Sequence, residues 1–423
     1  MEQIVHAPVD EIEELNIIPI PKIYLSRNNI HEPGFTSYIT EYSGNTTSDI
    51  FELNTNIDEY FSFLDYDKND LDIHNEKFPF LDASITKYIE SKFLQTDPTI
   101  KTDKILIIAR NQLITPQLIK IMKQYCGIIF LDYNHQICNL PPNIKYLEVL
   151  GKHEHDFNNL HAGLLFLEIN MLDTNNNNCN SSFDNLPYTI MILQFRNCNL
   201  IKKINDFPAS LIELELDNYY HDIDNLPDSL RYFAMRGNYG PISNLPPHLT
   251  NFSSFSEQSF NIISPFSEEL KLFGFNGDIE PEQFNMLPNS VIKILINREL
   301  MDNITYPKSL KILYAQEYGL MNFDLIPEGV EVLHVCEAFL GLIKPELLPK
   351  SLKIFMIQYD ADFHDNRHYK RESESESESE SESENETENA NDSQPRKKSR
   401  YETKKEILIE YLTTNGISIV DTW

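Results

Sequence analysis

Apolar residues return along the middle of the chain at intervals of 19 to 26 residues. Each copy begins with an apolar residue, which proline follows in nine copies, and clean copies of the phrase apolar-Pro-x-Ser-Leu begin at Leu226, Tyr306 and Leu348. The eleven copies start at Leu140, Leu160, Leu186, Phe207, Leu226, Leu245, Phe266, Leu287, Tyr306, Ile326 and Leu348. A repeat of this length is typical of a solenoid, in which successive turns of the chain stack on one another.

Positions within a copy are counted from its first residue, which is position zero. Positions four and seven are apolar in every copy, and position nine is apolar in every copy except the one with Ser254. Positions seven and nine share one face of a strand, because side chains alternate along a strand. So few apolar residues per repeat cannot form a core alone, and neighbouring repeats must stack to bury them. The sequence predicts a mainly β, leucine-rich-repeat-like solenoid of about eleven repeats over residues 137–361.

Three copies carry a further signature, Phe157-Asn158, Phe260-Asn261-Ile262 and Phe284-Asn285, ahead of the Leu-Pro-x-Ser-Leu-x-x-Leu phrase. This phrase resembles the FNIP repeat family, a leucine-rich-repeat-like group common in slime moulds and giant viruses of amoebae. The resemblance covers roughly residues 137–358, and several copies have Ile where the family has Phe. Members look like interaction proteins, often joined to an F-box that recruits a ubiquitin ligase, so the resemblance implies a protein-binding role.

Residues 1–100 lack the repeat, and the sequence does not specify the fold of this N-terminal region. Ser84–Phe93 predicts a helix with one apolar face. An F-box requires Leu-Pro followed by two apolar helices, and Ile20-Pro21-Lys22-Ile23 is the only such start. Pro33-Gly34 then interrupts the helical pattern. A ubiquitin-ligase substrate adaptor with an F-box-like N-terminal region therefore stays an alternative. Co-purification with a ligase subunit would distinguish it from a plain interaction scaffold.

Residues 101–136 predict a strand, a helix and a second strand ahead of the solenoid. The apolar runs Ile105–Ile108 and Ile128–Leu131 indicate buried strands, and Pro116–Tyr125 indicates a helix between them. Because the end of a solenoid must be covered, we expect this α/β segment to be a leucine-rich-like capping unit.

Residues 362–400 predict a disordered linker. Ser and Glu alternate through Glu372–Glu388, and such a run cannot bury a core. Its serines have the acidic neighbours that acidophilic kinases prefer, although the run also fits a plain solvated spacer. The basic cluster Arg396–Arg400 either acts as a nuclear-import signal or pairs with the acidic run.

Residues 401–423 predict a short amphipathic segment. Ile407, Leu408, Tyr411 and Leu412 lie on one side of a predicted helix, and an apolar stretch follows them. This segment is disordered, docks on its own solenoid or binds a partner.

Composition restricts the classes of partner and the compartment. A formal net charge of −30 argues against non-specific nucleic-acid binding, because the phosphate backbone would be repelled. Five scattered cysteines favour a reduced intracellular protein, cytoplasmic or nuclear, and in the host cell if the protein is viral. No apolar run approaches the length of a bilayer span, so we expect no membrane partner.

Candidate chemistry is sparse. His153–Asp156 and the segment Asp362–His368 hold several potential metal ligands, but neither has a second cluster at a fixed spacing, and we interpret both as solvated loops. The chain has no phosphate-binding loop, no G-x-S-x-G and no H-E-x-x-H. We therefore predict no catalytic residue, no cofactor and no metal, and a monomer that is not an enzyme.

The remaining prediction concerns positions six, eight and ten, which alternate with the buried positions and should line an exposed concave face. Early copies are acidic there and late copies are apolar, which predicts a two-part surface that accepts a polypeptide. The alternative is that the N-terminal region or the tail covers it. The candidate residues are Glu148, Glu168, Glu213, Glu215, Leu295, Ile312, Tyr314, Val332, His334, Ile354 and Met356.

Overall fold

The computed structural model describes residues 50–54, 101–109, 113–358 with gaps in several loops, and 400–422. The chain forms two compact units, residues 1–272 and residues 273–423. The predicted helix Ser84–Phe93, the His153–Asp156 loop and the Ser-Glu run lie outside the described residues.

The first unit begins with two strands that precede the repeats. β1 (Ile50–Asn54) pairs antiparallel with β2 (Lys101–Ala109), and β1 was not predicted. α6 (Pro116–Met122) follows, with Pro116 at its start and the Thr115 hydroxyl accepting a hydrogen bond from the Leu118 amide at 3.2 Å. β3 (Tyr125–Leu131) then pairs parallel with β2. The predicted strand–helix–strand order is therefore present, with a helix shorter than predicted.

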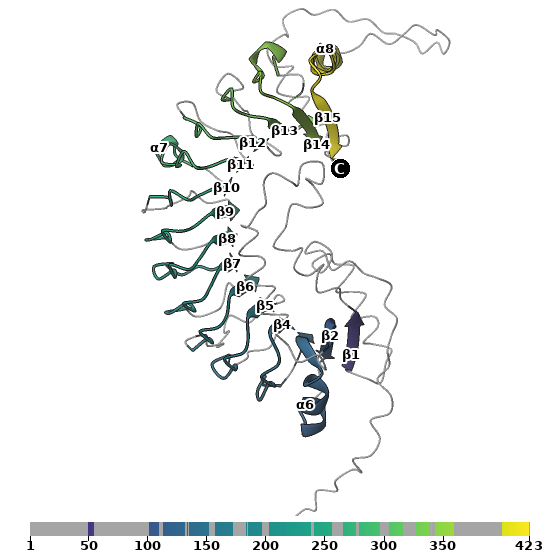
Figure 1. Cartoon of the computed structure of the whole chain (residues 1–423), viewed down its shortest axis with the longest axis vertical. Coiled ribbons are helices and arrows are strands. Elements are labelled where there is room, and N and C mark those ends of the chain that lie inside the picture. Colours follow the sequence, from purple (N-terminus) through teal and green to yellow (C-terminus); the bar gives the residue numbers. More distant parts are fainter. Residues whose placement is uncertain are drawn as a thin grey trace, which may run out of the picture. The chain divides into compact units, whose positions relative to one another are not determined.

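Six parallel strands continue this unit, one for each of the first six copies of the repeat (Figure 1). They are β4 (Tyr146–Gly151), β5 (Phe166–Met171), β6 (Ile192–Arg196), β7 (Glu213–Asp217), β8 (Tyr232–Arg236) and β9 (Asn251–Phe255). Their register aligns equal positions of the copies: Leu147 lies opposite Leu167, which lies opposite Leu193. Each side chain of the repeat therefore lies beside its counterparts on the neighbouring strands.

The second unit continues the repeats and ends with a helix and a strand. Its elements are β10 (Leu272–Phe275), α7 (Pro281–Phe284), β11 (Lys293–Ile296), β12 (Ile312–Ala315), β13 (Val332–Cys336), the 3₁₀ helix η3 (Pro345–Leu347), β14 (Ile354–Gln358), α8 (Arg400–Thr414) and β15 (Ser418–Thr422). β11 to β15 are parallel and in register. Figure 1 shows β15 beside β14 and α8 next to them.

The core of each unit consists of the positions that the repeat predicts. Position four is buried in every copy, and position seven has no solvent exposure in any of them, from Leu147 to Phe355. Position nine is buried as well, including Ser254. The predicted fold class, a mainly β solenoid with a repeat of about 20 residues, is therefore confirmed.

The serine of the repeat phrase has a structural role that the sequence pattern did not reveal. The Ser229 hydroxyl lies 2.8 Å from the Ala209 carbonyl oxygen and 2.7 Å from that of Leu211, both one copy earlier. Ser210, Ser309 and Ser351 make the same pair of contacts to the preceding copy. This ladder of hydroxyl donors satisfies carbonyl groups in the turns that precede the strands.

We expect Ser229→Ala to lower the free energy of unfolding by about 1 to 3 kcal/mol, because two carbonyl groups lose their common donor. Thr189 occupies the equivalent position and donates to the Leu164 carbonyl at 2.8 Å. Ser229→Thr is therefore the matched control and should retain most of the stability. Urea denaturation measures both variants, and equal losses in the two would contradict the role of the hydroxyl.

The C-terminal segment docks on its own unit, which was one of the alternatives that the sequence left open. β15 adds to the edge of β14, with Phe355 opposite Ile419 and Met356 opposite Val420. Leu408 and Leu412 of α8 are buried. The predicted helix face was partly wrong, because Ile407 is 53% exposed: the buried side of α8 follows residues four apart and leaves Ile407 outside it.

Candidate polypeptide-binding faces

In the first unit, positions six, eight and ten of β4–β9 form a polar face. The prediction that Glu148, Glu168, Glu213 and Glu215 are exposed was wrong, since each is at most 4% exposed. Parallel strands lie roughly 4.8 Å apart, so equal side chains on neighbouring strands press against one another and shield each other's flanks. The Tyr146 and Phe166 rings illustrate this contact, with centroids 4.5 Å apart.

Most acidic groups of the polar face have partners on it. Glu168 lies 2.8 Å from the Arg196 guanidinium, and Glu215 lies 3.2 Å from that of Arg236. The Gln194 amide donates to Glu213 Oε1 at 2.7 Å. These contacts connect neighbouring strands, so the polar groups of the face also join one repeat to the next.

The pKa of Glu148 is strongly perturbed. Burial, and then the neighbouring charge of Glu168, raise the pKa of its carboxyl to about 8. The Tyr146 hydroxyl donates to Glu148 Oε2 at 2.5 Å, and this bond and Arg196 lower the pKa by smaller amounts. The Glu148 carboxyl therefore holds a proton at neutral pH.

Several buried oxygen atoms of the polar face accept no hydrogen bond within the described part of the chain, and three of them carry the argument. They belong to Glu148 (Oε1), Gln194 (Oε1) and Ser253 (Oγ). All three residues occupy position eight, and the strand register places them in one row with Glu168, Glu215 and Ala234. We call these six residues the position-eight row. A buried acceptor without a donor costs free energy, so the row has unused capacity to bind donors.

In the second unit, positions six and eight of β11–β14 form an apolar face. Ile312, Tyr314, Val332, His334, Ile354 and Met356 were predicted to be exposed but are all buried, and Leu295 is half-buried. The register again brings equal positions together and packs the Tyr314 ring against the His334 ring, with ring centroids 4.9 Å apart. The Lys293 ammonium lies 4.9 Å from the Tyr314 ring centroid. Burial, and then the charge of Lys293, lower the pKa of His334 to about 4.

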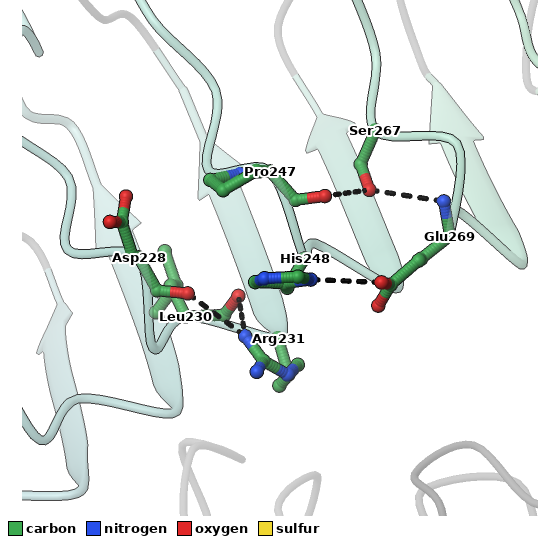
Figure 2. Close-up of polar contacts among 7 residues, drawn as sticks. All are labelled: Asp228, Leu230, Arg231, Pro247, His248, Ser267 and Glu269. Atoms are coloured by element: carbon green, nitrogen blue, oxygen red, sulfur yellow. Dashed lines mark hydrogen bonds and ion pairs between the residues drawn. The ribbon is translucent and has the colours of Figure 1, made fainter.

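The turns that lead into the strands also carry polar side chains, and two of their contacts join neighbouring repeats (Figure 2). His248 pairs with Glu269 at 2.8 Å, and the Ser267 hydroxyl donates to the Pro247 carbonyl at 2.6 Å. Arg231 donates to the Asp228 carbonyl at 3.0 Å. His248 and Glu269 are both about half exposed, and such an ion pair contributes only about 0 to 1 kcal/mol.

Among the described residues, no group of three His, Cys, Asp or Glu side chains is arranged to hold a metal ion. No helix in the described part of the chain is long and apolar enough to cross a membrane.

Comparison with known proteins gives matches to solved structures alone. No family model matches the chain, and no curated protein matches it. CroV588, described as a novel circular LRR protein, is 20% identical with a TM-score of 0.33, and the match covers 55% of this chain and 43% of that one. YopM from Yersinia enterocolitica WA-314 is 16% identical with a TM-score of 0.33, over 56% of this chain and 57% of YopM. The match thus spans about half the length of each of these two proteins.

Proposed function

We propose that this protein is a non-enzymatic interaction scaffold that binds a polypeptide along its strand faces. The observation that carries the proposal is the position-eight row, with its buried acceptors at Glu148, Gln194 and Ser253. A polypeptide offers N–H groups and side-chain donors at short, regular intervals, which suits a row of acceptors repeated from strand to strand. The FNIP-like repeat phrase also implies protein binding.

The polar face is accessible at position ten of β8. The Arg236 side chain is 42% exposed, although its partner Glu215 is only 1% exposed. A bound segment would enter beside Arg236 and reach the position-eight row. It would displace some of the groups that pack around this row. The apolar face of the second unit would supply separate contacts of the hydrophobic kind.

Site-specific photocrosslinking tests this proposal. A photoreactive amino acid at Arg236 is expected to capture a polypeptide in cell extract, whereas the same group at Tyr188 is not. Tyr188 is the matched control because it is 70% exposed and lies in the turn before β6, away from the polar face. Capture from Tyr188 and Arg236 alike, or from neither, would contradict binding at the polar face.

A ubiquitin-ligase substrate adaptor is the alternative, and it rests on the family resemblance. It requires an F-box-like surface in residues 1–100, of which the structure describes residues 50–54. Co-purification of the full chain with the F-box-binding ligase subunit tests it. A scaffold of either kind would act inside a cell, in the cytoplasm or, through Arg396–Arg400, in the nucleus.

A further inference from the structure

We infer that the polar face selects a basic polypeptide and binds its arginine or lysine side chains through the position-eight row. This inference rests on the proposed function and names the chemistry of the partner. It follows from the charge of the face, from the unused acceptors and from the geometry of the row.

The charge of the polar face is the first argument. Positions six, eight and ten of β4–β9 hold five carboxyl groups, on Glu148, Glu168, Glu213, Glu215 and Asp217, and two guanidinium groups, on Arg196 and Arg236. The two arginines pair with Glu168 and Glu215. Glu148 holds its proton at neutral pH, so at most four carboxylates of the face oppose the two guanidinium groups. This excess of up to two negative charges attracts cations and disfavours phosphate or anionic partners.

The unused acceptors are the second argument, and those on Gln194 and Ser253 do not depend on the acidic groups. Gln194 is neutral and fully buried, and its Oε1 has no donor although its Nε2 is bound to Glu213. Glu148 Oε1 and Ser253 Oγ are also buried and have no hydrogen-bond donor within the described part of the chain. Guanidinium and ammonium groups carry only donors, so they can satisfy these atoms and add no acceptor of their own. In a buried site such charge-assisted hydrogen bonds are stronger than in water.

Geometry is the third argument. β4 and β9 are five strand spacings apart, which is about 24 Å from Glu148 to Ser253 along the row. An extended chain rises about 3.3 Å per residue, so a segment of about eight residues spans the row. Alternate side chains of such a segment point to one side, and alternating Arg or Lys residues would therefore face the row.

The test uses two fluorescent octapeptides and the full-length protein. One alternates arginine with serine, and the other replaces each arginine by citrulline, which keeps a similar shape and N–H groups but has no charge. We expect the arginine peptide to bind at least about tenfold more tightly, because charge-assisted hydrogen bonds contribute about 1.5 to 3 kcal/mol each. Equal affinity for the two peptides would overturn the inference. This comparison needs no variant of the protein.

A pair of variants then locates the site. Glu148→Gln keeps the size of the side chain and an acceptor for Tyr146, and it should weaken binding of the arginine peptide by about ten- to a hundredfold. Asp228→Asn removes one carboxylate from the turn side of the same unit, shown in Figure 2, and should leave binding unchanged. Equal effects of the two variants would assign binding to net charge and overturn the inference.

The outcomes separate the inference from the proposed function. Capture of a polypeptide from Arg236, together with no preference for the arginine peptide, would refute a basic partner and leave the scaffold in place. Binding of the arginine peptide at Glu148 without capture from Arg236 would support the cationic site and argue against a cellular partner that lies along the whole face.

Discussion

Removal of residues 400–423 is expected to turn the protein into one that self-associates through β14. β15 pairs with β14 along its whole length, from Ile354 opposite Ser418 to Gln358 opposite Thr422. Without β15, the outer N–H and C=O groups of β14 lose their partners. An unpaired strand edge beside buried apolar side chains such as Phe355 is a template for pairing with another chain. Sedimentation of the truncated and full-length proteins at increasing concentration measures the effect.

Point substitutions in α8 distinguish loss of docking from loss of chain length. Leu412 is fully buried, so Leu412→Ala should cost about 2 to 5 kcal/mol and release the segment. Ile407 lies in the same helix but is 53% exposed, so Ile407→Ala should change stability by less than about 0.5 kcal/mol. Hydrogen exchange of the β15 amides reports the docking. Unchanged protection in Leu412→Ala would show that the segment docks without this contact.

Docking of the tail also bears on the proposed function. If partners are recovered with the full chain and with a form that ends at Ala361, the repeats bind them. If the partners disappear on truncation, residues 362–423 are required, and the strand faces alone do not explain recognition. The Ile407→Ala variant serves as the control with a docked tail and an intact chain length.

The repeat positions could be predicted because each is fixed by local periodicity. Positions four, seven and nine follow from the alternation of strands and from the stacking of short repeats, and the structure buries all of them. The strand–helix–strand order of residues 101–136 could be predicted for a similar reason, because two apolar runs flank a segment with a proline at its start. Neither prediction required knowledge of distant contacts.

Whether the polar and apolar strand faces are buried or exposed could not be predicted from the alternation of side chains along a strand. That argument assigns one face of a strand to the core and the other to solvent, but a parallel sheet can be buried on both faces. In the sequence Glu148 and Glu168 are 20 residues apart and resemble surface acids. The strand register makes them direct neighbours on β4 and β5. The signal that could have indicated this was the recurrence of acid and amide at position eight of the early copies, at Glu148, Glu168, Gln194 and Glu215. The recurrence of serine in the repeat phrase was likewise visible in the sequence, but it did not indicate that the hydroxyls bridge neighbouring copies.

Opposite responses to pH are expected in the two units. Folded Glu148 keeps its proton up to about pH 8, whereas the unfolded carboxyl loses it near pH 4.5. The stability that this group contributes is therefore fully present below pH 4.5 and is lost as pH rises to about 8, at most on the order of 5 kcal/mol. Burial lowers the pKa of His334 from 6.5 to about 4, so its contribution is present above pH 6.5 and is lost as pH falls to about 4.

Hydrogen exchange measured between pH 4.5 and 8 and corrected for the intrinsic rate separates the two units. The amides of β4 and β5 should become less protected with rising pH, and those of β12 and β13 should become more protected up to pH 6.5. Glu148→Gln cannot ionise, so it should remove the first trend and leave the second, while Asp228→Asn should change neither.

If Glu148→Gln keeps the loss of protection in β4 and β5, another group causes it. If the unaltered protein shows no loss of protection in β4 and β5 as pH rises, Glu148 ionises in the folded state as readily as in the unfolded chain. Because the same proton must leave when an arginine binds at Glu148, this measurement also tests whether that carboxyl is available to a cationic partner near neutral pH.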